Sequence, residues 1–285
     1  MLTPPVIDRV VRAALDEDAP WGDLTSEYLI PADSVATADL VAREAGVFSG
    51  GQVFAAAFAL TDPRVDVELR VADGTPFSPG DVLASVTGPA RAILTAERIG
   101  LNFAQRMSGV ATVTARYVAE VAGTRARIVD TRKTTPGLRA LERHAVRSGG
   151  GHNHRHSLSD AVMAKDNHLA LLTRGGASVT EALIAAKARL PHTAHLEVEV
   201  DRLDQIEPVL AAGVGTIMLD NFSLADLQAG VAQVAGRATV EASGGVSLDT
   251  VGAIARTGVD VISVGALTHS ARALDLGLDI RIDGS

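Results

Sequence analysis

The stretch that decides the fold begins Ala126-Arg-Ile-Val-Asp-Thr-Arg-Lys133, a candidate β-strand that ends in charged residues. The same pattern returns further along the chain, where short apolar runs are followed by polar or glycine residues and then by a helical stretch. The six candidate strands are residues 126–130, 161–165, 195–200, 216–220, 239–243 and 261–264. Strands that alternate with helices in this way predict βαβ units and a parallel sheet. Six units are fewer than those of a full barrel, so the pattern alone allows an incomplete barrel or an open doubly wound sheet.

The N-terminal part of the chain mixes candidate helices and strands without a uniform repeat. Residues 4–18 and 51–60 have helical patterns, and residues 65–71 alternate between apolar and polar side chains, as a half-buried strand does. Residues 92–122 predict one or two long helices, with a break near Gly109. Further helical stretches separate the later strands, at residues 137–147, 179–190, 202–212, 223–235 and 247–257.

The composition excludes several classes of protein. The chain has no cysteine, which rules out thiol catalysis, cysteine-based zinc sites and disulfides. Aromatic residues make up only 3%, too few for a surface that stacks nucleic-acid bases. The charged N-terminal segment predicts neither a signal peptide nor an anchor, and no uncharged apolar run is long enough to span a bilayer. We therefore expect a cytoplasmic enzyme.

Basic residues gather in one window of an otherwise acidic protein. The formal net charge is -8, yet residues 132–165 hold seven arginines and lysines against two acidic residues. The chain has three lysines, and two of them, Lys133 and Lys165, lie in this window. Lysine differs from arginine as a compact charge whose pKa moves on burial. The window therefore predicts a local anion-binding site in which both lysines have functional roles.

The candidate strands of the second half all end in polar or glycine residues. Catalytic groups of a parallel α/β barrel lie where the strands end, so these positions should meet at one site. They are Thr131, Arg132 and Lys133, then Lys165, Glu199, Asp220, Asn221, Ser243, Gly244, Gly245, Gly265 and Ala266. Any one of them could be a turn or a helix cap, and it is their shared placement that predicts an active site. Glu197, on the same face as Glu199, could equally be a buried structural carboxylate.

The segment Ser243-Gly-Gly-Val-Ser247 opens a helix and predicts a phosphate cradle, because glycines let backbone N–H groups approach a phosphate. Neither dinucleotide nor nucleoside triphosphate fingerprints are present, which argues against a dehydrogenase and a triphosphatase. Glu199 and Asp220 could hold Mg²⁺, directly or indirectly, against substrate phosphates. They could instead pair with Arg132 or Lys165.

A cluster of histidines, His152-Asn-His-Arg-His156, looks at first like a metal-binding tract. It is flanked by glycine, is rich in cations and lacks the spacing of a zinc site. We expect His154 to contact an anion, and His152 and His156 to lie on the surface of a loop.

These residues form a series of motifs that resembles one family. The motifs are Thr95-Ala-Glu-Arg98, Asp130-Thr-Arg-Lys-Thr-Thr-Pro-Gly-Leu-Arg139, Gly149-Gly-Gly-His-Asn-His-Arg155, Lys165-Asp-Asn-His168, Glu197-Val-Glu-Val200, Leu219-Asp-Asn-Phe222, Ser243-Gly-Gly245 and Val264-Gly-Ala266. In this order, and over nearly the whole chain, they resemble the quinolinate phosphoribosyltransferases, also called nicotinate-nucleotide pyrophosphorylases (carboxylating).

The resemblance implies an α/β fold with two domains. An N-terminal α/β open-faced sandwich would cover residues 1–107, with the C-terminal tail 268–285 packed against it. An incomplete parallel α/β barrel of about six strands would cover residues 108–267. The implied enzyme is a homodimer, or a higher oligomer, in which the N-terminal domain of one subunit caps the barrel of the other.

The implied reaction joins quinolinate to phosphoribosyl pyrophosphate, with Mg²⁺, and releases pyrophosphate and carbon dioxide. Its product is nicotinate mononucleotide, an intermediate of de novo NAD synthesis. Neither nucleic acid nor a membrane is an implied partner.

The resemblance also suggests a role for each motif. Arg132, Arg155 and Lys165 would grip the dicarboxylate together with Thr131 and His154, and Arg98 would reach in from the partner subunit. Lys133 would contact the pyrophosphate leaving group. Glu199 and Asp220 would bind Mg²⁺ and ribose hydroxyls, and with Lys133 they are the catalytic candidates. The 5′-phosphate would lie in two cradles, formed by Ser243, Gly244 and Gly245 and by Val264, Gly265 and Ala266.

Three other functions compete with this one. A homologous phosphoribosyltransferase associated with molybdate transport would keep the phosphoribose half and change the other substrate. A Schiff-base aldolase would use Lys165 at a strand end, although the crowd of arginines argues against it. A non-enzymatic phosphosugar-binding module would not need so many charges beyond the phosphate cradle.

Overall fold

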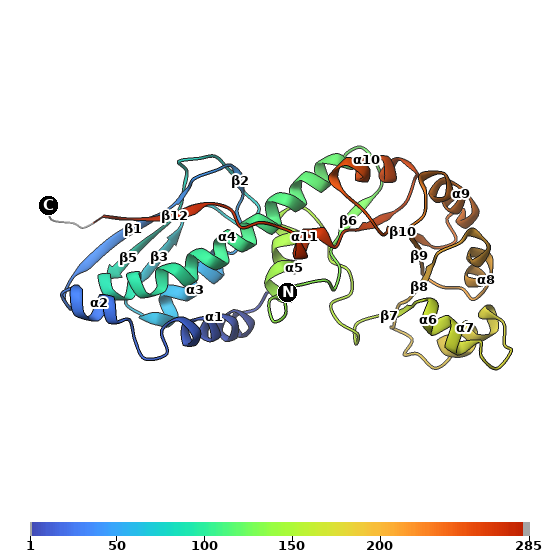
Figure 1. Ribbon diagram of the computed structural model, residues 1–285, viewed down its shortest axis with the longest axis horizontal. Helices are drawn as coiled ribbons and strands as arrows, with labels where there is room; N and C mark the ends of the chain where they lie inside the picture. The colour runs from blue at the N-terminus through green and yellow to red at the C-terminus, as the bar shows by residue number, and fades with distance from the viewer. Residues whose placement is uncertain (1, 282–285) are drawn as a thin grey trace. The chain divides into compact units, whose positions relative to one another are not determined.

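The computed structural model describes residues 2–281, which form two compact units (Figure 1). The first unit takes residues up to Ala115, then Thr134–Gly150, and then the chain from Leu267 onward. The second takes Arg116–Lys133 and Gly151–Ala266. The chain therefore passes between the units more than once, and residues 134–150 lie with the N-terminal part although they sit between strands of the second unit. The predicted tail extends to residue 285, and residues 282–285 of it lie outside the described residues.

The first unit contains a four-stranded antiparallel sheet in the order β12-β1-β5-β3. Its strands are β1 (Val35–Ala42), β3 (Asp66–Leu69), β5 (Val82–Pro89) and β12 (Leu276–Arg281), and a small pair is formed by β2 (Gly46–Val47) and β4 (Pro76–Phe77). Every second residue of β1 from Ala36 to Ala42 is buried, as expected for a strand with one face on the core. The C-terminal strand thus joins a sheet that begins with residue 35.

Helices complete the first unit. They are α1 (Pro4–Asp18), α2 (Leu24–Leu29), α3 (Gly51–Thr61), the greater part of α4 (Ala90–Glu120), α5 (Arg139–Ser148) and the short α11 (Ala266–His269). Phe54 and Phe58 of α3 are fully buried and meet edge to edge, with 4.9 Å between the ring centroids. Each such aromatic side chain removes a large apolar area from water, so the core of this unit depends strongly on α3.

The predicted break at Gly109 is wrong, because α4 is one unbroken helix of 31 residues. Gly109 is needed inside this helix for close packing rather than to end it. A Cβ atom at this position would lie 1.9 Å from the backbone oxygen of Arg272, so only glycine lets the returning C-terminal segment lie against the helix. The sequence pattern showed the glycine but could not show which distant backbone it meets.

The second unit is built on six parallel strands, as predicted. They are β6 (Arg127–Val129), β7 (Val162–Ala164), β8 (Leu196–Val200), β9 (Thr216–Asp220), β10 (Thr239–Ser243) and β11 (Val261–Ser263). The sheet order is β6-β11-β10-β9-β8-β7, so successive strands are neighbours and the last returns to the first. A doubly wound sheet would reverse its order part-way. This order is that of a barrel left open between β6 and β7, which confirms the incomplete barrel.

Except for the first, the helices of the second unit follow the strands that they were predicted to follow. They are α6 (Asp166–Leu172), α7 (Val179–Lys187), the single turn η1 (Leu203–Gln205), α8 (Ile206–Ala211), α9 (Leu224–Val234) and α10 (Leu248–Arg256). The hydroxyl of Ser178 caps α7 and that of Ser223 caps α9, each by accepting a backbone N–H. The short helices α2, α6 and α11 were not predicted. Among residues 2–281, no helix is long and apolar enough to cross a membrane.

Asp73 connects two helices of the first unit. Its carboxylate accepts the backbone N–H groups of Gly50 and Gly51, at 3.1 and 3.0 Å, and so caps α3, whose first residue has no capping side chain of its own. The other contact is His144 of α5, whose Nε2 lies 2.6 Å from Asp73 Oδ2. Burial raises the pKa of the Asp73 carboxyl, but the bonds from His144 and the two amides outweigh burial and hold that pKa below its usual value.

We expect Asp73→Asn to lower the free energy of unfolding by about 2 kcal/mol, because it weakens a helix cap and a charged hydrogen bond together. Urea denaturation followed by circular dichroism measures the loss. Asp66→Asn, at an exposed position of β3, is the matched control and should change stability by less than about 0.5 kcal/mol. Equal losses in the two variants would show that Asp73 does not hold α3 and α5 together.

Candidate active site

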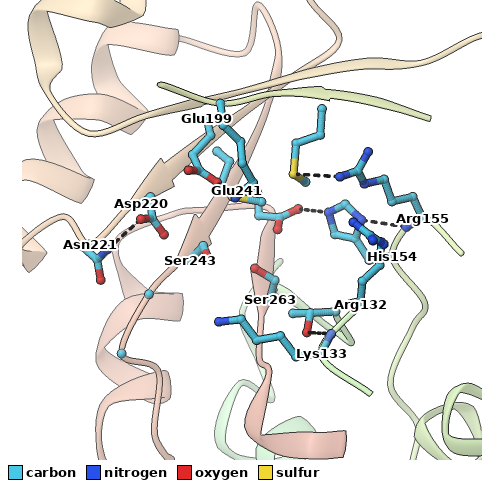
Figure 2. A pocket seen from close by; sticks show the side chains of 16 residues that line it. Arg132, Lys133, His154, Arg155, Glu199, Asp220, Asn221, Glu241, Ser243 and Ser263 are labelled. Atoms are coloured by element: carbon cyan, nitrogen blue, oxygen red, sulfur yellow. Dashed lines mark hydrogen bonds and ion pairs between the residues drawn. The ribbon is translucent and has the colours of Figure 1, made fainter. Parts of the chain in front are cut away.

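A cavity of about 560 Å³ lies at the carboxyl ends of the barrel strands (Figure 2). All the residues that line it belong to the second unit. The structure brings together here eleven of the predicted site residues: Thr131, Arg132, Lys133, His154, Arg155, Lys165, Glu199, Asp220, Ser243, Gly244 and Gly245. They come from five strand ends and from the loop before β7, so the shared placement inferred from the sequence corresponds to one cavity.

Asp130 fixes the loop that carries His154 and Arg155. Its side chain is fully buried at the end of β6, where one oxygen accepts the backbone N–H of His154 at 2.7 Å and the other accepts Asn153 Nδ2 at 2.6 Å. Backbone bonds between His152 and β6 extend this strand-like contact. A buried carboxylate needs such donors. The loop is therefore held against β6 at the open edge of the barrel.

The guanidinium of Arg155 is held in place by contacts with Ala161 and Met163. Its Nη1 donates to the carbonyl oxygen of Ala161 at 3.0 Å. Its Nη2 lies 3.6 Å from the sulfur of Met163, a contact that Figure 2 shows. Burial lowers the pKa of Arg155, the neighbouring charge of Arg132 lowers it further, and Glu197 opposes both. Two guanidinium groups that repel each other in a half-buried cavity favour the binding of an anion between them.

Lys165 and Glu199 form an ion pair, with 2.6 Å between Nζ and Oε2. This is one of the two pairings that the sequence left open for Glu199. Lys165 is 45% exposed and Glu199 15% exposed, so the pair faces the cavity rather than the core. A pair that faces solvent in this way contributes little to stability, so each partner can give up the other and bind a group of the substrate instead.

Asp220, Asn221 and Gly244 form a compact turn at the ends of β9 and β10. Asn221 has a left-handed backbone (φ 57°), and its Nδ2 donates to Asp220 Oδ2 at 2.7 Å. Gly244 has φ +91°, and a Cβ atom there would lie 2.9 Å from the backbone nitrogen of Asn221. Only glycine fits this close approach. The bare backbone of Gly244 and Gly245 at the start of α10 is what a phosphate cradle requires.

His154 lies between two buried glutamates on the floor of the cavity. Its Nε2 is 3.3 Å from Glu197 Oε2 on β8 and 3.3 Å from Glu241 Oε2 on β10. Its Nδ1 accepts the backbone N–H of Arg155 at 2.7 Å, and Figure 2 shows this bond and the contact with Glu241. The relative exposure of Glu197 is 4% and that of Glu241 is 3%. His154 was predicted to contact an anion, and in this structure the groups that it contacts are two carboxylates of the protein itself.

This cluster of His154, Glu197 and Glu241 holds a proton through neutral pH. Burial lowers the pKa of His154, but hydrogen bonds to Glu197 and Glu241 outweigh burial and raise it to about 10. Burial also raises the pKa of the Glu241 carboxyl, against the opposing effect of His154. Because Nδ1 accepts the backbone N–H of Arg155, the ring proton lies on Nε2, and the further proton that the cluster retains lies on the carboxylates, with which the ring titrates as one unit.

Four predicted site residues do not line the cavity. Arg98 is exposed on α4 and belongs to the first unit. Val264, Gly265 and Ala266 follow β11, but Val264 is buried and its N–H donates to the carbonyl of Val129.

The cavity also includes Asn221, a strand-end residue that the sequence placed at the site, and four residues that were not predicted there: Met163, Met218, Glu241 and Ser263. The alternation of side chains along a strand could have identified three of them. Met163, Met218 and Glu241 stand two residues before Lys165, Asp220 and Ser243, and so share a strand face with a predicted residue. Glu197 proves to be the buried carboxylate that the sequence allowed for.

Two sets of side chains have the chemistry to hold a metal ion. Glu199 and Asp220 supply carboxylate oxygens on neighbouring strands, which suits Mg²⁺ because this ion takes one or two carboxylates together with substrate phosphates and water. His154, Glu197 and Glu241 have ligand atoms within 4.8 Å of one another. The Nε2 atom of His154, however, carries the ring proton, because Nδ1 accepts a hydrogen bond, and a protonated nitrogen cannot bind a metal ion. The first pair therefore fits the predicted Mg²⁺ better.

Comparison with known proteins identifies the family. Residues 23–108 match the N-terminal domain, and residues 110–279 the C-terminal domain, of quinolinate phosphoribosyl transferase. The chain belongs to the quinolinate phosphoribosyl transferase family. The resemblance that the motifs indicated is thus confirmed, and the two matched domains cover almost all of the chain.

Individual relatives of this family are similar over nearly their full lengths. The nicotinate-nucleotide pyrophosphorylase [carboxylating] of Mycobacterium leprae is 46% identical over 279 residues, which cover 95% of either chain. Quinolinate phosphoribosyltransferase [decarboxylating] 1b of Nicotiana tabacum is 40% identical, over 95% of this chain and 81% of that protein. The crystal structure of NadC from Streptococcus pyogenes has a TM-score of 0.94 at 40% identity and covers 100% of this chain and 99% of that one.

The proton held by the buried cluster predicts a pH dependence of stability. A group whose folded-state pKa is raised stabilises the fold fully below its unfolded pKa, here 6.5, and loses that contribution as the pH rises through about 10. We expect the free energy of unfolding to fall over this window, and His154→Asn to flatten the fall. Urea titrations at a series of pH values measure it, with His192→Asn at an exposed position as the control. A fall that is equally steep in both variants would contradict the assignment.

Proposed function

We propose that this protein transfers the phosphoribosyl group of phosphoribosyl pyrophosphate to the ring nitrogen of quinolinate and releases pyrophosphate and carbon dioxide. The observation that carries the proposal is one cavity in which four cations, Arg132, Lys133, Arg155 and Lys165, lie beside a glycine cradle. Two strongly anionic reactants need such a surplus of cations. The family membership and the names of the relatives support the same reaction.

Quinolinate would bind on the side of the cavity where the arginines lie. Arg132 and Arg155 present planar guanidinium groups, which match carboxylates with two parallel hydrogen bonds. Lys165 would leave Glu199 to meet the second carboxylate. Arg98 of the partner subunit would complete the grip, as its exposed place on α4 permits.

The phosphoribosyl pyrophosphate would bind along the strand ends β8 to β10. Backbone N–H groups of Gly244 and Gly245 suit the 5′-phosphate, and Lys133 suits the departing pyrophosphate. Glu199 and Asp220 would bind ribose hydroxyls and Mg²⁺. When bound, Mg²⁺ neutralises charge on the pyrophosphate and so makes it a better leaving group.

The residues would act by position and charge rather than by a covalent intermediate. The nitrogen lone pair forms the bond to the anomeric carbon, while the electron pair of the carbon–oxygen bond leaves with pyrophosphate. Glu199 and Asp220 stabilise the positive charge that develops on the sugar, and the cations stabilise the pyrophosphate. The ring, now a pyridinium, accepts the electron pair left by carbon dioxide, and a proton replaces the lost carboxylate.

Quinolinate-dependent release of carbon dioxide tests the function directly. With phosphoribosyl pyrophosphate and Mg²⁺, kcat/KM for quinolinate should exceed that for nicotinate or nicotinamide by at least about 100-fold, because each lacks a carboxylate that the cations are placed to meet. Formation of nicotinate mononucleotide is the second readout. Equal rates with nicotinate, or none with quinolinate, would contradict the proposal and favour the homologue with a different acceptor.

A Schiff-base aldolase fits the cavity less well. Its lysine must be a free amine, whereas Lys165 is engaged in a 2.6 Å ion pair with Glu199. The other cations of the cavity have no function in that chemistry.

We also propose a homodimer with shared sites. Trp21, Leu24, Tyr28 and Leu29 expose large apolar side chains around α2, with Trp21 92% exposed. Exposed apolar residues that lie together on one element are typical of surfaces that bind another protein. Arg98 is exposed in the same unit. A cytoplasmic location stays a prediction.

Mixing two inactive variants tests the shared site. Arg98→Ala and Lys165→Ala should each be nearly inactive alone, yet subunit exchange between them should restore about a quarter of wild-type activity. The fraction follows because half of the dimers are hybrids and one of their two sites is intact. Exchange is followed by native mass spectrometry, and mixing each variant with itself is the control. Full exchange without recovered activity would exclude a shared site.

A further inference from the structure

The buried glutamates Glu197 and Glu241 have no role in the chemistry described above. They lie on β8 and β10, and among residues 2–281 both form an ion pair with His154, whose Nε2 lies 3.3 Å from each. The Oε1 atom of each is buried and has no hydrogen-bond partner. Leaving such atoms unpaired costs about 1–3 kcal/mol each. A fold that keeps two carboxylates here must gain something other than stability from them.

The contacts of His154 lead from these glutamates to Arg155. The ring accepts the backbone N–H of Arg155 at Nδ1, at 2.7 Å, while the backbone N–H of His154 itself is held by Asp130. The guanidinium of Arg155 donates a hydrogen bond to the carbonyl oxygen of Ala161, and the negative charge of Glu197 attracts it. Ring, backbone and guanidinium are thus linked in one series, which Figure 2 shows from Glu241 through His154 to Arg155.

We propose that Glu197 and Glu241 are positioning residues for the quinolinate half of the reaction. They fix the His154 ring between two strands, and the ring fixes the backbone of Arg155 so that its guanidinium meets a carboxylate of the ligand. This inference rests on the proposed function, because it takes Arg155 as a quinolinate contact.

The effect should be confined to one substrate. Glu199, Asp220 and Gly244 are placed by strand ends and by the turn at Asn221, and no hydrogen bond connects them to His154 among the bonds described for residues 2–281. Loosening His154 therefore disturbs the arginine side of the cavity and leaves the phosphoribose side in place. A residue needed only for stability would affect both substrates alike.

A metal ion between the same three side chains is the competing explanation of their arrangement, since their ligand atoms lie within 4.8 Å of one another. A metal would need the lone pair of Nε2 and would place the ring proton on Nδ1. There it would point at the N–H of Arg155, donor against donor. The observed acceptor role of Nδ1 therefore favours a hydrogen-bonded cluster without a metal.

The experiment compares Glu241→Ala and Glu241→Gln in the full-length enzyme. For Glu241→Ala we expect KM for quinolinate to rise at least about 10-fold, with KM for phosphoribosyl pyrophosphate within about 2-fold of wild type. Glu241→Gln keeps an acceptor for Nε2, so it should restore KM for quinolinate to within about 3-fold. Glu197→Ala and Glu197→Gln repeat the test from β8.

Asp73→Ala is the matched control, because Asp73 is also a partly buried carboxylate paired with a histidine but belongs to the other unit. It should lower the melting temperature and leave both KM values unchanged. Should Glu241→Ala fail to fold, the Gln variants and the Glu197 variants carry the comparison. Circular dichroism melts separate lost stability from lost binding in every variant.

The outcomes are distinct. A wild type without quinolinate-dependent activity overturns the proposed function and this inference with it. An active wild type whose Ala variants change both KM values equally, or change only kcat, overturns the positioning role alone. Binding of quinolinate to wild type, measured by calorimetry without phosphoribosyl pyrophosphate, should be unaffected by EDTA. Loss of that binding in EDTA, restored by a divalent ion, would overturn the inference in favour of a metal.

Discussion

The carboxylate of Asp130, fully buried at the end of β6, is the constraint on which the site depends. It holds the loop before β7 by the amide of His154 and the side chain of Asn153. This loop stands at the open side of the barrel, where β6 and β7 have no strand between them to fix their distance. In a closed barrel, ladder hydrogen bonds would define that spacing. Here the buried acid and its donors, together with the backbone bonds of His152 to β6, define where the loop and its arginine lie.

The cavity combines both signs of charge in a small volume. Cations from the loops after β6 and β7 meet carboxylates that point inward from β8, β9 and β10. Without ligands, the acids limit the repulsion among the cations, as the Lys165–Glu199 pair shows. Side chains that already lie in place need little rearrangement when charge develops during a reaction. The substrate, however, must first replace these ionic contacts between protein side chains, which weakens its binding.

The sequence predicted the parts of this arrangement that depend on local pattern. Lys133, Lys165 and Asp220 were found because each follows an apolar run, and parallel strands bring such ends together. The alternation of side chains along a strand could place Glu241 on the same strand face as Ser243, but could not show its role, because its partner His154 is far away in the chain. Gly109 was misread for a similar reason, since the backbone that requires it belongs to Arg272. Such contacts across the sequence are set by tertiary packing alone.

The return of the C-terminal segment to the first sheet has a consequence for synthesis in the cell. Strand β1, which begins at residue 35, has β12 as one of its two neighbours, and β12 ends at residue 281. The ribosome therefore has to translate the chain as far as β12 before this edge of β1 can be covered. Until then the nascent chain exposes an unpaired strand edge, the kind of surface that chaperones shield. The emergence of β12, rather than that of the N-terminal residues alone, is the step that completes this sheet.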